Sequence, residues 1–134
     1  GLEQRCTLTI GFRLPPRLPP VAAESALIEL LPAGNHYSFT GAESPYRGPK
    51  DTILTRAFRG AIREQGGTPR FKVKTGTSDM NVVAPQWTVP TVAYGPGDSS
   101  LDHTPNEHVR IADLRRAGDV LISVFERLAA DNSR

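Results

Sequence analysis

The sequence predicts an α/β fold, in which helices alternate with β-strands and cover a largely parallel sheet. Apolar residues recur at helical spacing in residues 21–31, 51–65 and 112–130, and short β-branched or alternating runs stand at 70–74 and 89–94. Such alternation normally gives parallel strands with helices on the faces of the sheet. A hydrophobic fraction of 38% and a charged fraction of 22% are typical of a globular chain.

The first fifty residues are expected to hold two strands and one helix. Residues 6–14 alternate and are rich in β-branched side chains, which favours a strand. The prolines between 15 and 20 stop this strand, and good helix formers follow from 21 to 31. A short strand is expected at 36–40. Residues 41–50 contain two glycines and two prolines, which is typical of a connection between two units.

The remainder is expected to alternate helix and strand to its end. Asp51 or Thr52 can cap a helix that Gly66-Gly67 ends. Pro85 is expected to stop a short helix that starts at Ser78 or Asp79. The elements expected after residue 67 are a strand at 70–74, a helix at 78–83, a strand at 89–94 and a helix at 112–130. Because ligands of such folds bind beyond the carboxyl ends of the strands, loops 75–81 and 95–108 are expected at one rim.

Charge is unevenly distributed along the chain, although the net charge is only +2. A basic block at 47–74 can bind nucleic acid, an acidic protein or an anionic substrate. Aromatic side chains for base stacking are few there, so nucleic acid is not expected as a partner, and a solvated helix face is the simplest interpretation. The block has two acidic residues and eight basic ones: Arg47, Lys50, Arg56, Arg59, Arg63, Arg70, Lys72 and Lys74.

Two further features bear on the cellular location. No apolar run approaches the roughly 20 residues that a membrane span needs, so no membrane association is expected. Cys6 is the single cysteine, which excludes an internal disulfide and fits a reducing compartment. A cytoplasmic location is therefore expected.

The densest polar cluster, GPGDSSLDHTPNEH at 95–108, holds five acidic or histidine residues within eleven positions. Histidine and carboxylate groups are the usual zinc ligands, which makes His103 a candidate ligand. An alternative is structural: Thr104-Pro105-Asn106-Glu107 has the form of a capping box, with Glu107 reaching back to a helix start. Spacing alone favours the capping interpretation and leaves metal binding open.

A second cluster, TGTSDMN at 75–81, places a glycine between two threonines and before Ser78-Asp79. Backbone N–H groups and hydroxyls at a helix start suit a carboxylate or phosphate ligand. An ordinary strand-to-helix turn, capped by Ser78 or Asp79, explains the same residues. It is no Walker loop, because the lysine after the glycines is absent.

Three segments, FRLPP, KTGTSDMNVVAPQW and VPTVAYGPGDSSLDHTPNEHV, together carry a resemblance that covers nearly all 134 residues. They resemble the co-catalytic zinc hydrolases that include acetylornithine deacetylase, succinyl-diaminopimelate desuccinylase and carboxypeptidase G. The similarity is closest to the lysine-biosynthesis branch, which releases lysine or ornithine from an acylated or carrier-bound precursor. The resemblance implies a three-layer α/β catalytic domain interrupted by a small α+β lid domain that also forms the dimer. It implies that residues 1–46 are a remnant of the lid and 47–134 the carboxy-terminal part of the catalytic domain.

The resemblance also implies a site with two zinc ions, for which cobalt can substitute. His103 matches a metal ligand near the carboxyl end of the family's chains, and Glu107 matches the acidic residue after it. Four positions match residues that contact the substrate in the family: Gly76, Thr77, Ser99 and Arg47. Asp79 is expected in a supporting role at a helix start.

The family's His-x-Asp motif, bridging aspartate and paired glutamates have no counterpart in these 134 residues. We therefore expect a fragment that is inactive alone, whose parent enzyme acts on a small acylated amino acid or on an acidic amino-group carrier protein. An alternative is a non-catalytic assembly module that pairs with a separately encoded amino-terminal half. Cutting a sheet exposes strand edges and apolar faces, so a homo-oligomer is expected.

Overall fold

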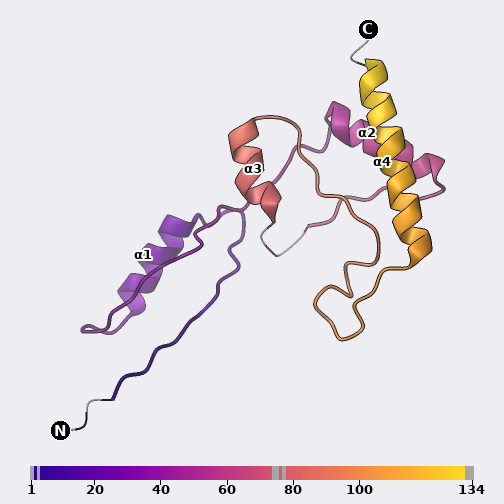
Figure 1. The fold of residues 1–134 in the computed structure, drawn as a ribbon. Coiled ribbons are helices and arrows are strands. Elements are labelled where there is room, and N and C mark those ends of the chain that lie inside the picture. Colours follow the sequence, from indigo (N-terminus) through magenta and orange to yellow (C-terminus); the bar gives the residue numbers. More distant parts are fainter. Residues whose placement is uncertain (1, 3, 74–75, 77, 132–134) are drawn as a thin grey trace.

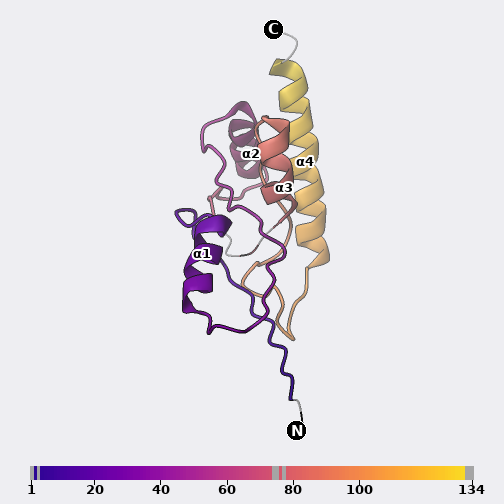
Figure 2. The same cartoon turned by 90° about the vertical axis from the view of Figure 1, so that its left-hand side faces the viewer.

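The computed structural model describes residues 2, 4–73, 76 and 78–131. Within them the chain forms α1 (Pro20–Leu30), α2 (Ile53–Glu64), α3 (Asp79–Trp87) and α4 (Ile111–Asp131), joined by extended segments and turns. Figure 1 shows α2 crossing α4 at one end of the molecule, with α1 well away from both. The turned view of Figure 2 again separates α1 from α4. Of the helices described, none combines the length and apolar character needed to cross a membrane.

The core lies between α2 and α4, the one pair of described helices in extensive contact. Ala57 and Ala61 of α2 are buried against Val120 and Val124 of α4, and partly buried apolar side chains surround them: Leu54, Phe58, Ile62 and Leu128. Small side chains on α2 let the two helices approach closely. Gly60 shows how close they come, since a Cβ added there would lie 2.8 Å from a guanidinium nitrogen of Arg127.

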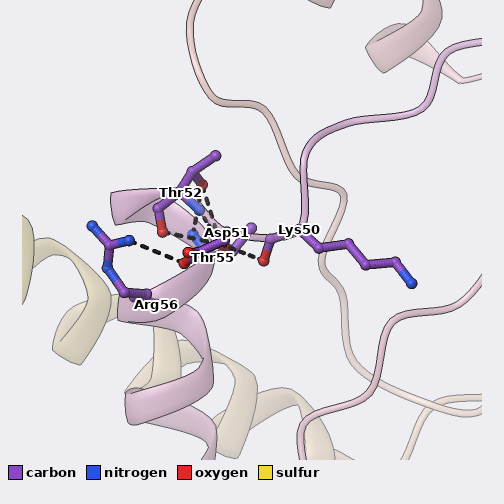
Figure 3. Close-up of polar contacts among 5 residues, drawn as sticks. All are labelled: Lys50, Asp51, Thr52, Thr55 and Arg56. Carbon is purple, nitrogen blue, oxygen red and sulfur yellow. Dashed lines mark hydrogen bonds and ion pairs between the residues drawn. The ribbon is translucent and has the colours of Figure 1, made fainter.

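The start of α2 is fixed by a capping box (Figure 3). Thr52 Oγ1 accepts a hydrogen bond from the Thr55 backbone N–H at 3.1 Å, and Thr55 Oγ1 accepts one from the Thr52 N–H at 2.8 Å. Thr55 is itself buried. Arg56 pairs with Asp51 at 3.0 Å beside the cap. The prediction of a cap at 51 or 52 is thus confirmed, with Thr52 as the capping residue.

The predicted helices are confirmed at 21–31, 51–65 and 112–130, with ends shifted by one or two residues. The predicted end of the short helix before Pro85 is wrong, because α3 continues to Trp87 with Pro85 inside it. Proline lacks an N–H, so this helix loses a single backbone hydrogen bond at Pro85. Thr88 then ends the helix in a left-handed conformation, with φ of 51°.

The predicted strands are wrong for the described residues, which contain four helices and no strand. No strand forms at residues 6–14, 36–40, 70–73 or 89–94, and Lys74 lies outside the described part. A strand needs a neighbour that pairs with its N–H and C=O groups, and no such ladder forms here. The expected α/β layers are therefore not observed. Leu8, Ile10 and Phe12 keep the alternation of a strand but expose their side chains.

Candidate functional site

The loop at 95–110, which leads into α4 (Figure 1), is built from three successive turns. Backbone N–H groups of Leu101, Thr104 and Glu107 each donate to the carbonyl three residues earlier, at 3.0–3.1 Å. The alternative of a helix start at 104–107 is not observed, because these turns do not continue into a helix and α4 begins only at Ile111. Local hydrogen bonds, not a helix, fix the shape of this loop.

His103 stands in this loop with an exposed side chain and a left-handed backbone, with φ of 63°. Its backbone N–H donates to Glu107 Oε2 at 2.9 Å. Left-handed geometry is unfavourable for a residue with a Cβ, so the hydrogen bond offsets part of that cost. Glu107 thus reaches back as in a capping box, but to a residue that precedes no helix. This hydrogen bond to Glu107 fixes the backbone that carries the His103 imidazole.

Asp98, Ser99 and Ser100 form the first turn of the loop. The Ser100 backbone N–H donates to Asp98 Oδ1 at 2.9 Å. This hydrogen bond is the main cause of a lowered pKa for the Asp98 carboxyl, and the charge of Lys72 lowers that pKa further. Lys72 Nζ also donates to Ser99 Oγ at 3.0 Å. The structure therefore ties the segment before residue 74 to the loop at 95–110, although no sheet joins them.

A cavity of about 520 Å³ lies between this loop and the first half of α4. Arg110 binds Asp113 through two hydrogen bonds, Nε to Oδ2 at 2.6 Å and Nη2 to Oδ1 at 3.0 Å. Arg116 lies 3.7 Å from the same carboxylate. Arg110 is the main cause of a lowered pKa for Asp113. The lining is Tyr94, Gly95, Pro96, Gly97, Asp98, Leu101, His108, Arg110, Asp113, Arg116 and Ala117.

Sequence reasoning did not select the charged residues on the α4 side of this cavity. Arg110, Asp113 and Arg116 follow one another at three-residue intervals, a spacing that places their side chains on one side of a helix start. That signal was present in the sequence. Tyr94 on the opposite side packs against Phe58, with ring centroids 5.1 Å apart, and burial raises the pKa of its hydroxyl.

Of the described residues that the sequence predicted for the site, none lines this cavity, and this includes His103, Glu107 and Ser99. Gly76 lies beside Arg13, since a Cβ added to it would be 3.0 Å from Arg13 Nη1. Arg47 and Asp79 are exposed, the first in an extended segment and the second as the first residue of α3. Thr77 lies outside the described residues. The structure thus connects Ser99 to Lys72 and Glu107 to His103, without gathering all the predicted residues in one place.

The residues that the structure describes include no group of three or more His, Cys, Asp or Glu side chains placed to hold a metal ion. A catalytic zinc ion takes about three ligands from the protein. The described part of this chain offers His103 as a candidate for one such ligand and does not form a complete set. Metal binding by His103 stays a prediction.

Comparison with known proteins gives several close relatives. The [LysW]-lysine hydrolase of Deinococcus radiodurans is 61% identical over 129 residues, which are 96% of this chain and 36% of that relative. A protein of Thermococcus kodakarensis is 40% identical over 128 residues, 95% of this chain and 33% of that relative. The [LysW]-lysine/[LysW]-ornithine hydrolase of Sulfurisphaera tokodaii is 40% identical over 76 residues, 57% of this chain and 21% of that relative. The chain spans about a third of the length of the first two relatives.

A protein-family model described as Peptidase family M20/M25/M40 matches residues 3–127. This match covers all three segments that carry the resemblance, together with α1, α2, α3 and most of α4. It confirms the resemblance to the metal-dependent amide hydrolases from nearly one end of the sequence to the other. The chain belongs to peptidase family M20/M25/M40.

Proposed function

We propose that this chain is part of a metal-dependent amidohydrolase that releases lysine or ornithine from the carrier LysW in amino-acid biosynthesis. The observation that carries the proposal is 61% identity to the [LysW]-lysine hydrolase over 96% of this chain. These 134 residues alone are proposed to be inactive, because they offer one candidate metal ligand, His103, to a centre that needs several.

In this proposal, the loop at 95–110 holds one ligand of the metal centre. His103 would ligate zinc, or cobalt in its place, and Glu107 would keep the His103 backbone in position through its 2.9 Å hydrogen bond. Two metal ions would supply an activated water, as in the family that the sequence resembles. Since the described residues do not complete that centre, no catalytic step is assigned to this chain.

Substrate contacts are proposed at four positions: Gly76, Thr77, Ser99 and Arg47. Ser99 has the most direct structural support, because Lys72 donates to its hydroxyl at 3.0 Å and so brings a positive charge to the loop. Asp79 would support the loop that contains Gly76 by starting α3. A carboxylate or amide oxygen of the substrate is a suitable partner for Lys72 and Ser99 together.

The parent enzyme is proposed to have the organisation that the resemblance implies. Residues 1–46 would belong to a small α+β lid that also forms a homo-oligomer, and residues 47–134 to a three-layer α/β catalytic domain. Alternating apolar residues at 6–14 support strands that pair once their neighbours are present. The enzyme is proposed to be cytoplasmic, to bind no nucleic acid and to associate with no membrane.

The carrier is proposed to bind the basic face of α2. Arg56, Arg59 and Arg63 are exposed and lie on one side of this helix, opposite the side that packs on α4. An acidic carrier protein would be attracted to this face. Arg56 is partly neutralised by Asp51, so Arg59 and Arg63 would contribute most of the attraction.

A hybrid hydrolase tests the function directly. In it, this chain replaces the matched residues of the Deinococcus radiodurans protein, and hydrolysis of lysine-loaded LysW is measured with zinc or cobalt. We expect turnover by the hybrid and none by the isolated chain. His103→Ala should lower hydrolysis by more than about 100-fold, since losing only an outer-shell partner of a ligand already costs about 10–100-fold. His36→Ala, at another exposed histidine, is the matched control.

Charge reversal in the hybrid tests the carrier contact. Arg59→Glu with Arg63→Glu should raise KM for LysW by about tenfold or more at low salt and leave kcat nearly unchanged. Reversal of Arg17 and Arg115, which are also exposed, is the control. Equal KM values for the two double variants would remove α2 from the carrier interface.

A non-catalytic assembly module that pairs with a separately encoded half is the alternative. Both proposals rest on one observation, that the chain matches only 36% of the length of its Deinococcus relative. A hybrid that folds and binds LysW without hydrolysing the loaded carrier would favour this alternative.

A further inference from the structure

The loop that carries His103 is closed at its base by a contact between its two ends. A Cβ added to Gly97 would lie 3.7 Å from Val109 Cγ2 and 3.9 Å from the His108 carbonyl oxygen, so the two ends of the loop lie side by side. Gly97 has φ of 89°, a conformation that glycine adopts at little cost. Residues 98–107 therefore form a compact surface loop of the Ω type. The orientation of the whole loop is set at this base.

Arg110 directly follows the base and joins it to α4. The Arg110 carbonyl oxygen accepts hydrogen bonds from the Asp113 and Leu114 backbone N–H groups, at 3.0 and 3.1 Å. The Arg110 guanidinium binds both oxygens of the Asp113 carboxylate, through Nε at 2.6 Å and Nη2 at 3.0 Å. A two-point contact of this kind fixes orientation as well as distance. The backbone and the side chain of Arg110 are thus both tied to the first turn of α4.

Asp113 is the residue at which these contacts meet. Its side chain is only 18% exposed, although that of Arg110 is 73% exposed. Arg116, three residues further along α4, lies 3.7 Å from the same carboxylate and adds a second positive charge beside it. The cavity of about 520 Å³ separates this part of α4 from the loop, so side-chain packing does not fix the loop on the helix there. Polar contacts at Asp113 therefore hold the end of the loop.

We propose that Asp113 is a positioning residue, which orients the loop at 95–110 by holding Arg110 at the base of that loop. The packing of α4 on α2 supplies the fixed frame for this contact. The inference rests on the proposed function for what the loop does with His103, but the orientation of the loop is a property of this chain alone. Asp113 itself touches no reacting group and acts through Arg110.

A simpler role for Asp113 is to stabilise the start of α4 in a general way. A carboxylate in the first turn of any helix interacts favourably with the helix dipole. The two roles differ in their dependence on Arg110. A dipole effect is the same with and without the Arg110 side chain, whereas positioning through Arg110 is lost with it. A double-mutant cycle separates the two roles.

Hydrogen exchange tests the proposal in the chain itself. Asp113→Ala and Arg110→Ala should each speed exchange of the loop amides by about threefold to tenfold, and the double variant should show no further increase. Exchange in α2 should change far less. Asp119→Ala, at an exposed aspartate later in α4, is the matched control and should leave the loop amides unchanged. The probes are three backbone N–H groups that the turns of the loop protect: Leu101, Thr104 and Glu107.

The other outcomes of this cycle would each overturn the proposal. Increases that add in the double variant would favour the dipole effect. An equal increase in α2 would mean that Asp113 stabilises the whole fold and does not position the loop in particular. Loop amides that exchange as fast in Asp119→Ala as in Asp113→Ala would show that any charge lost from α4 has the same effect.

The hybrid hydrolase connects the loop to the reaction. There Asp113→Ala should lower kcat by about tenfold or more, since a small displacement of a group near a reacting centre is costly. KM for LysW should stay nearly unchanged, because the carrier is proposed to bind on α2. A higher KM with an unchanged kcat would overturn the role of Asp113 in the reaction. An unsubstituted hybrid that does not hydrolyse the loaded carrier would contradict the proposed function alone, and the exchange cycle would still decide whether Asp113 positions the loop.

Discussion

The α2–α4 pair and the loop at 95–110 are held in shape by different means. Buried alanine and valine side chains about sixty residues apart in the sequence hold the helix pair together. In the loop, most hydrogen bonds join residues two to four positions apart, as between His103 and Glu107. One region therefore depends on long-range packing and the other on local polar contacts.

This difference separates stability from function within the chain. The helix pair contains no proposed metal ligand and supplies the main buried core, and its proposed part in function is confined to the exposed basic face of α2 and to Asp113 at the start of α4. The loop contains His103 and Ser99 and buries little apolar surface. Functional loops positioned by a packed scaffold are a general arrangement in proteins. Substitutions in the pair should therefore change the free energy of unfolding, and substitutions elsewhere should change it far less.

The largest effect on stability is expected from Val120→Ala. Val120 is only 2% exposed and lies in the centre of the α2–α4 core. Removing two methyl groups there leaves a cavity and should lower the free energy of unfolding by about 2 kcal/mol. Urea unfolding followed by helical circular dichroism measures this change.

The matched control for that substitution is Val21→Ala in α1. Val21 is 73% exposed, so its truncation should change the free energy of unfolding by less than about 0.5 kcal/mol. Equal effects at the two valines would mean that the helix pair is not the main source of stability.

A smaller effect is expected at the helix starts. Thr52→Ala removes the hydroxyl that accepts from the Thr55 N–H and should cost about 1 kcal/mol of unfolding free energy. At the start of α3, by contrast, the Asn81 backbone N–H donates to the Ser78 carbonyl at 2.8 Å, and the Asn81 side chain accepts from the Ser78 N–H. Ser78→Ala should therefore cost less than Thr52→Ala, and the reverse order in urea unfolding would contradict this account.

The sequence was sufficient to predict the helices but not the sheet. The 3–4 spacing and the cap at Thr52 are local properties, and α2 forms where they predict it. A strand also needs a partner, and the spacing of Leu8, Ile10 and Phe12 contains no information on where that partner is. The same limit applies to α4, whose apolar residues at Leu114 and Phe125 were correctly placed on a helix but are exposed.

The candidate site was predictable in its residues more than in its geometry. His103 and Glu107 were selected from one cluster, and the hydrogen bond between them is a local consequence of spacing. The contact between Lys72 and Ser99 spans 27 positions and could not be predicted without the fold. The left-handed backbone of His103 was also missed, because neither glycine nor asparagine marks it.

A gain in stability, smaller than the previous losses, is expected from Thr88→Gly at the end of α3. A β-branched residue at φ of 51° is strained by about 1–2 kcal/mol, and glycine removes that strain at an entropic cost of about 0.5–1 kcal/mol. The net gain should be about 0.5 kcal/mol. Because α3 lies outside the α2–α4 core, the gain should appear as slower hydrogen exchange of α3 amides. Slower exchange in α2 as well would show that the two regions are coupled.

The smallest expected effect is a pH dependence that belongs to the helix pair. Glu64 of α2 accepts a hydrogen bond from the Ser123 hydroxyl at 2.7 Å and pairs with Arg127 of α4. The Ser123 hydrogen bond is the main cause of a lowered pKa for Glu64, and Arg127 lowers that pKa further. A carboxyl whose folded-state pKa lies below its ordinary value of 4.5 contributes stability above that pH and loses it as the pH falls through the folded-state value.

Both Glu64→Gln and Ser123→Ala should therefore reduce the loss of stability in acid. Urea unfolding at several pH values from about 3 to about 6 measures this loss for each variant. Glu64→Gln should remove the contribution of this carboxyl entirely, and Ser123→Ala should remove its larger part, because Arg127 still acts on Glu64 in that variant. If both variants retained the full acid sensitivity of the unsubstituted chain, the contact between α2 and α4 would rest on apolar burial alone. The polar edge of the helix pair would then resemble the loop in one respect, because its polar contacts would shape the surface and add little stability.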